Sequence, residues 1–147
     1  MKTYKVKARK LSGTALKEVR QKAWDFYQTI KKKSKRRTYV RSTYFKKEKI
    51  FLDLFCHHTF EKQNWKERVR RLQYLPPGIE LIQKTNLDPI SKENPNKASE
   101  VLHRFSGVTS GQEVFCVQIK ENKQTSQKFL LSILQRSKKK LPAECGV

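Results

Sequence analysis

The sequence is poor in cysteine and contains no long apolar run. Its three cysteines, Cys56, Cys116 and Cys145, are an odd and widely spaced set among 147 residues. Such a set argues against a disulfide framework and favours a reducing compartment, so we expect a cytoplasmic protein. No run of about 18 apolar residues, signal-peptide core or lipidation motif is present. The sequence therefore predicts neither a membrane span nor a membrane anchor.

The motifs of several enzyme classes are also missing. We find no glycine-rich phosphate loop, no paired catalytic carboxylates and no Ser/His/Asp set, so a nucleotide hydrolase or a metal-dependent nuclease is not supported. Cys56, His57 and His58 invite a metal interpretation, but adjacent ligands rarely build a closed tetrahedral site, and no CxxC or HxxxH supplies the rest. We expect no metal and no cofactor, and we interpret His57 and His58 as a strand-to-helix junction.

Acidic residues are scarce, and the basic residues that are present dominate the chain. The 34 Lys and Arg against 13 Asp and Glu give a formal net charge of +21. Such an excess repels itself and is tolerated best when the partner is a polyanion. Phosphate backbones fit, because each neutralised phosphate releases counterions and drives binding. We therefore expect RNA or a ribosome as partner, with recruitment to an anionic lipid surface as the weaker alternative.

The length suits one compact domain, and eight Phe, five Tyr and two Trp suffice for a core. We expect a basic arm and amphipathic helix over 1–37, an α+β core over 38–135 and a flexible basic tail over 136–147. The helix should span Thr14–Arg36, because apolar residues recur there at helical spacing. Its apolar stripe consists of Leu16, Val19, Ala23, Tyr27 and Ile30, widened by Trp24 and Phe26.

The remaining elements predict a small antiparallel sheet packed against helices. Two strands joined by a charged turn should cover residues 38–45 and 50–55, although the second segment could instead begin a helix. Asn64 and Glu67 have the spacing of a capping box before a helix that ends at Pro76-Pro77-Gly78, where a second short helix begins. Residues 85–97 read as a polar loop. A three-stranded meander should follow over 100–108, 112–121 and 127–134.

Alternation along these three strands separates an apolar face from a polar, basic face. Val101, His103 and Phe105 should face the core, which favours a structural, hydrogen-bonded His103 over a catalytic one. The opposite face could cradle a phosphate, and an ordinary solvated sheet is the alternative. The candidates on that face are Arg104, Gln118, Lys120, Lys128 and Ser132.

Cations on the helices complete the candidate set. Arg68 lies at the flank of an apolar stripe, where a guanidinium either snorkels or is aimed at an anion. Arg70 and Arg71 point away from that stripe and are more typical of a solvated face. The candidates for RNA contact are Arg68, Arg70, Arg71, Lys31, Lys32, Lys33, Arg36, Arg37 and Gln118.

The segments LHRFSGVTSGQEVFCVQIKE and QKFLLSIL, together with the order of elements over residues 38–134, resemble the RelE/barnase/EndoU/colicin-like ribonuclease superfamily. The phage-associated and toxin branches are the most similar. The resemblance implies metal-independent RNA cleavage, in which the 2′-hydroxyl attacks the adjacent phosphate. It also implies an acidic antitoxin or immunity protein as a second partner.

The resemblance also assigns roles. Arg104 and Lys120 would bind the phosphate, Lys128 would do the same or act as general acid, and Ser132 would orient the phosphate. Arg68 would reach in from its helix, with His103 as the reserve acid or base. The chain departs from the pattern in its long N-terminal helix and in the lack of an unmistakable His/Glu base pair. The alternatives are a non-enzymatic RNA- or ribosome-binding protein and, in third place, a DNA-binding or mobile-element accessory protein.

Overall fold

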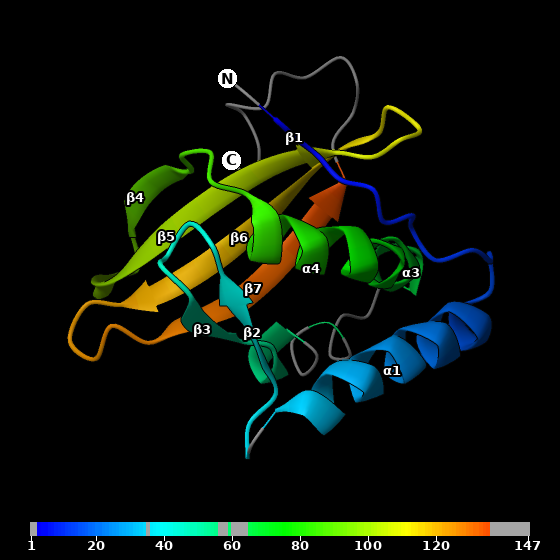
Figure 1. Cartoon of the computed structure of the whole chain (residues 1–147), viewed down its shortest axis with the longest axis horizontal. Helices are drawn as coiled ribbons and strands as arrows, with labels where there is room; N and C mark the ends of the chain where they lie inside the picture. Colours follow the sequence, from blue (N-terminus) through cyan, green and yellow to red (C-terminus); the bar gives the residue numbers. More distant parts are fainter. Residues whose placement is uncertain (1–2, 35, 56–58, 60–64, 136–147) are drawn as a thin grey trace.

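The computed structural model describes residues 3–34, 36–55, 59 and 65–135, and it shows an α+β fold with a long N-terminal helix (Figure 1). A curled, mixed seven-stranded sheet forms the body of the fold. No helix among these residues is long and apolar enough to cross a membrane. The elements are β1 (Tyr4–Lys5), α1 (Leu16–Lys33), β2 (Tyr39–Ser42), β3 (Glu48–Phe51), α3 (Trp65–Gln73), α4 (Leu75–Lys84), β4 (Ile90–Asn94), β5 (Lys97–Val108), β6 (Val114–Asn122) and β7 (Lys128–Gln135).

The sheet is larger than the sequence predicts, and it is not purely antiparallel. Its order is β1-β5-β6-β7-β3-β2, with β4 also paired to β5. The predicted meander is confirmed as the antiparallel strands β5, β6 and β7. The N-terminal arm adds β1 parallel to the end of β5, and β3 pairs in parallel with β7. Segments far apart in the sequence therefore complete both edges of the meander.

Two predicted segments differ in the structure. The prediction of a polar loop over 85–97 is wrong, because residues 90–94 form β4 and pair antiparallel with β5. The second predicted strand ends at Phe51, and residues 53–55 are helical, which was the alternative left open for that segment. The predicted cap at Asn64 lies outside the described residues. The junction at the prolines is confirmed, since α4 begins at Leu75 with a proline in its first turn.

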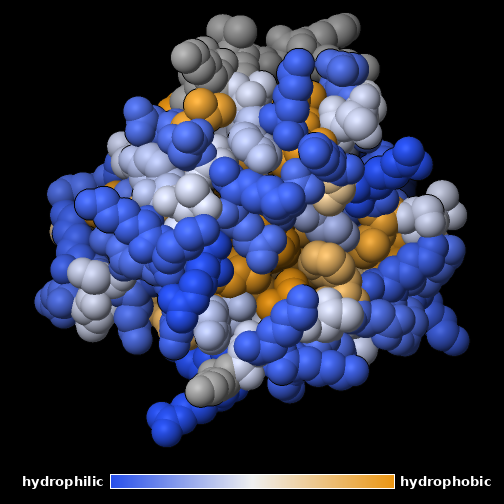
Figure 2. All heavy atoms as spheres, in the orientation of Figure 1, coloured by the Kyte–Doolittle hydropathy of each residue, from blue (hydrophilic) through white to orange (hydrophobic). Residues whose placement is uncertain are grey.

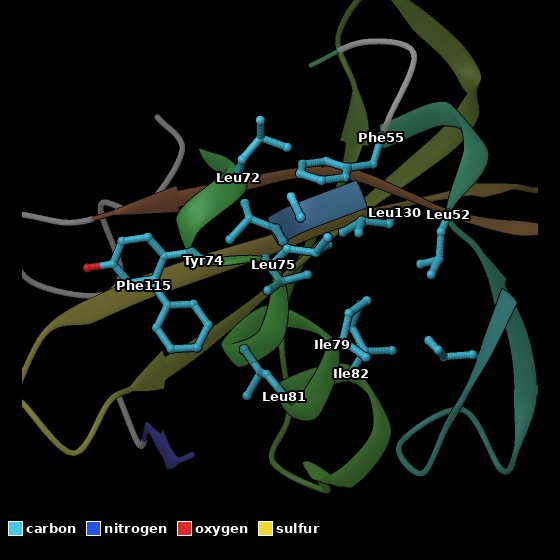
Figure 3. Close-up of a cluster of buried hydrophobic side chains, with 14 of the residues drawn as sticks. Leu52, Phe55, Leu72, Tyr74, Leu75, Ile79, Leu81, Ile82, Phe115 and Leu130 are labelled. Atoms are coloured by element: carbon cyan, nitrogen blue, oxygen red, sulfur yellow. The ribbon is translucent and has the colours of Figure 1, made fainter. Parts of the chain in front are cut away.

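The hydrophobic core lies between one face of the sheet and the helices α3 and α4 (Figure 3). Gly78 brings α4 close to β7, because a Cβ at this position would lie 2.6 Å from Cδ1 of Ile133. Large buried side chains from both layers meet there, and the face of the sheet that they cover is called the helix face. The labelled core residues are Leu52, Phe55, Leu72, Tyr74, Leu75, Ile79, Leu81, Ile82, Phe115 and Leu130.

A β-bulge changes which side chains of β7 face the helices. Gln118 pairs with Ser132 but Ile119 pairs with Leu130, so Leu131 is one residue more than β6 can match. Leu130 and Ile133 are consequently both fully buried in the core. Lys128 also turns to the helix face, opposite Glu121. The predicted placement of Lys128 and Ser132 on the same face is therefore wrong.

The helix α1 packs against α3 and buries Val19, Ala23 and Tyr27. The predicted stripe is confirmed at these positions. Trp24, however, is 45 % exposed and does not join the stripe. At 100° per residue Trp24 lies beside Ala23 on the helix but points toward solvent.

Candidate nucleic-acid interface

The face of the sheet turned away from α3 and α4 carries a continuous group of cations, rings and hydrogen-bonding side chains. Alternation along each strand selects these residues, and the register of the hairpin and the meander places them side by side. We call this surface the basic face. It consists of Tyr39, Arg41, Lys49, Phe51, Arg104, Gln118, Lys120, Phe129 and Ser132.

A row of three predicted residues crosses the basic face. Arg104, Gln118 and Ser132 are direct neighbours on β5, β6 and β7. The Ser132 hydroxyl donates to the Gln118 side-chain carbonyl at 3.3 Å. Arg104 is 7 % exposed, and its Nε has no hydrogen-bond partner among the described residues. A guanidinium this buried is costly without a counter-charge, and a phosphate oxygen would provide both the charge and the missing acceptor.

Aromatic rings hold two further cations in the next part of the basic face. The Arg37 guanidinium lies 4.3 Å from the ring centre of Phe51 and 5.4 Å from that of Phe129. The Lys120 ammonium lies 5.6 Å from the Phe129 ring centre. These contacts fix long side chains that would otherwise be mobile. A hollow of about 360 Å³ opens between them, lined by Arg37, Asp53, Leu54, Lys120 and Phe129.

The hairpin of β2 and β3 extends this arrangement to the edge of the sheet. Arg41 and Lys49 are cross-strand partners, and their charges lie 5.6 and 4.7 Å from the ring centre of Tyr39. Both side chains are exposed. Neither forms an ion pair with a carboxylate in the described part of the chain, so both retain their charge for a ligand.

Carboxylates neutralise only part of the charge of the basic face. Arg37 bonds Asp53 through both its Nε and a terminal nitrogen, at 3.2 and 2.8 Å. Lys120 lies 3.4 Å from a Glu100 oxygen. Arg41, Lys49 and Arg104 have no such partner within the described ranges. The net positive field on this face favours an anionic ligand.

A second polar group lies on the helix face. His103 Nδ1 is 2.7 Å from the Ser91 hydroxyl, and its Nε2 is 2.7 Å from Glu121. Lys128, whose side chain is 4 % exposed, lies 2.9 Å from Glu48 and 3.7 Å from Glu121. His103 is thus hydrogen-bonded at both ring nitrogens, as its core-facing position on the strand predicts. Two carboxylates surround Lys128, so its charge is compensated within the protein.

The structure thus divides the predicted catalytic residues between two faces. Arg104, Lys120 and Ser132, with Gln118, lie on the basic face. His103 and Lys128 lie on the helix face, because His103 alternates with Arg104 and because the bulge turns Lys128. The predicted residues therefore do not meet in one cleft.

The cations predicted on the helices have different surroundings. Lys31, Lys32 and Lys33 are exposed in the last turn of α1, and Arg36 is exposed after it. On α3, Arg70 is exposed and Arg71 is partly buried. Arg68 is also partly buried, and its Nε has no hydrogen-bond partner in the described part of the protein. Arg37 lies over two rings of the basic face, Phe51 and Phe129.

Sequence reasoning missed part of both groups. Tyr39, Arg41, Lys49 and Phe51 could have been found, because strand alternation separates them from buried Val40 and Ile50. The hydrogen-bonded series Ser91–His103–Glu121 could not be predicted, because Ser91 lies in a segment that was interpreted as a loop. The His/Glu pair that the sequence did not reveal exists only because β5 and β6 are adjacent.

No group of three or more His, Cys, Asp or Glu within the described ranges is placed to hold a metal ion, and Cys56, His57 and His58 lie outside those ranges. Cys116 is disulfide-bonded, so the expectation of reduced cysteines is wrong at this position.

Comparison of the chain with family models, with curated proteins and with solved structures gave no match.

Proposed function

We propose that this protein binds RNA, and that the basic face contacts the phosphate backbone. The observation that carries the proposal is a set of three cations on this face, Arg41, Lys49 and Arg104. None of them has a carboxylate partner among the described residues, and the Nε of the buried Arg104 has no hydrogen-bond partner there. The formal net charge of +21 supports a polyanionic ligand. Phosphate meets the needs of a buried guanidinium, since it accepts two parallel hydrogen bonds.

The test compares two variants that remove the same charges from different surfaces. Arg41→Gln/Lys49→Gln removes two exposed cations from the basic face. The control, Arg9→Gln/Lys84→Gln, removes one exposed cation from the segment between β1 and α1 and one from the end of α4. Affinity for a labelled RNA is measured by fluorescence anisotropy over a salt series. We expect the basic-face variant to lose about tenfold more affinity than the control, and its salt slope to fall by more than one unit. Equal losses would contradict an interface on this face.

Arg104→Lys tests the geometry of the central row, because it keeps the charge and removes the guanidinium fork. We expect weaker RNA binding with little change in the thermal midpoint of unfolding. Unchanged affinity would remove Arg104 from the interface.

Metal-independent RNA cleavage is the second candidate, and the His103–Glu121 pair is the observation that favours it. The resemblance to the RelE/barnase superfamily implies this activity, but the acid/base pair and the Arg104 row are on opposite faces. Incubation of the protein with total RNA and ribosomes in EDTA tests it. New 2′,3′-cyclic phosphate ends that disappear in His103→Gln or Ser132→Ala would support cleavage, and binding without new ends would leave RNA binding alone.

An acidic protein partner that covers the basic face is also proposed, and it should co-purify with this protein at native expression.

A further inference from the structure

The exposed indole of Trp24 is the feature of α1 that packing does not explain. Among the described residues, Trp24 is the one large hydrophobic residue that is exposed. Its ring stacks at 5.9 Å and 29° on Tyr27, one turn along the helix, whose own side chain is buried. The contact with Tyr27 orients the indole while leaving much of its surface in solvent.

The surroundings of Trp24 are basic and hollow. A concavity of about 410 Å³ runs along this side of α1 and is lined there by Lys17, Arg20, Gln21 and Trp24. These residues are three, four and seven positions before Trp24, so they share one side of the helix. Figure 2 shows that hydrophilic side chains cover most of the molecular face that carries α1. A flat ring in a cationic hollow complements a ligand that is both aromatic and anionic.

The rings of the basic face differ from Trp24 in one respect that decides their use. Cations already lie over the rings of Tyr39, Phe51 and Phe129. Those rings therefore position charges for phosphates and leave little ring surface for a base. No cation lies over the Trp24 indole within the described part of the chain, so a nucleobase can stack on it.

We propose that Trp24 stacks an unpaired base of RNA, with Lys17 and Arg20 beside it for the flanking phosphates. This site is separate from the basic face, and the inference rests on the proposed function. Bases inside a duplex have no free face, so a stacking contact of this kind selects single-stranded RNA. The basic face contacts only the backbone and makes no such distinction.

Tryptophan fluorescence gives a direct readout of the stacking. The chain has two tryptophans, Trp24 and Trp65, so Trp65→Phe leaves Trp24 as the only reporter. Single-stranded oligouridylate should quench its emission, and an RNA duplex of equal length should bind with little quenching. Bound oligouridylate without quenching, as judged by anisotropy, would overturn the proposal.

Affinity provides the second, independent readout in the otherwise unchanged protein. Trp24→Ala should weaken binding of the single strand about 5- to 150-fold, leave the duplex unaffected, and be largely rescued by Trp24→Phe. If Trp24→Ala binds both RNAs like the wild type, this inference fails while RNA binding stands. If the wild type binds neither RNA, the proposed function itself fails. A blue shift with phosphatidylserine vesicles and no response to RNA would assign Trp24 to a lipid surface and overturn the proposal.

Discussion

At the scale of single residues, two lysines on neighbouring strands can have different roles. Lys120 and Lys128 are both predicted to bind phosphate, yet only Lys120 lies on the basic face. Lys128 is nearly fully buried between Glu48 and Glu121. Its charge holds the turn between β2 and β3 against the meander. The chemistry of Lys128 is therefore structural, although its residue type and position in the sequence resemble those of Lys120.

This difference predicts a large effect of Lys128 on stability. Lys128→Met should lower the free energy of unfolding by about 3–5 kcal/mol, because it leaves two carboxylates facing each other without their cation. The effect is measured by urea denaturation. Lys123→Met is the control, since Lys123 pairs with Glu93 at the surface and its loss should leave the midpoint nearly unchanged. Equal midpoints for the two variants would mean that the Lys128 network does not stabilise the fold.

At the scale of elements, the contact between α4 and β7 positions a strand whose side chains lie on both faces of the sheet. Gly78 is the point of closest approach, and the nearest atom is the Cδ1 of Ile133. In the sequence, the strands β4, β5 and β6 lie between these two elements. Their packing therefore links the two halves of the core.

Gly78→Ala should destabilise the protein by about 1–3 kcal/mol, because the added methyl would overlap a fully buried side chain. Ile133→Val removes the atom that the methyl would strike. The double variant should therefore be less destabilised than the sum of the two single variants, as measured by chemical denaturation in a double-mutant cycle. Additive effects would show that the neighbouring chain adjusts without cost.

Two elements show where prediction from the sequence succeeds and where it fails. The helix over residues 16–33 follows from its 3.6-residue periodicity, which needs no tertiary information. The segment 90–94 has the composition of a loop, with Lys92, Glu93 and Asn94 in succession. It becomes β4 because the long strand β5 offers an unpaired edge, and a backbone ladder can form whatever the side chains are. Strand pairing of this kind is decided by the partner.

At the scale of the whole molecule, self-repulsion is the main electrostatic term. The net charge of +21 is held within a compact fold, whereas the unfolded chain spreads it over a larger volume. Screening should therefore favour the folded state. Raising NaCl from about 50 mM to about 500 mM should raise the thermal midpoint of unfolding, because the Debye length falls severalfold. A midpoint that falls with salt would instead mean that ion pairs such as Lys128–Glu48 outweigh the repulsion.

The same charge explains why the basic face was foreseen in part. The expectation of a polyanionic partner follows from composition, and strand alternation separates Arg104 from His103 without any coordinates. The clustering of Arg37 with Lys120 over Phe129 required the parallel pairing of β3 with β7, which joins residues about eighty positions apart.

By itself, the sequence determined the class of fold, the long helix, the meander and the excess of positive charge. These properties depend on local periodicity and on composition, which act between near neighbours or over the whole chain at once. Only the tertiary structure decided the seven-stranded order, the bulge that turns Lys128 away from Lys120, the His103–Glu121 pair and the exposure of Trp24. Each of these depends on which segments pack against each other, and packing is a competition among distant parts of the chain that local patterns do not record.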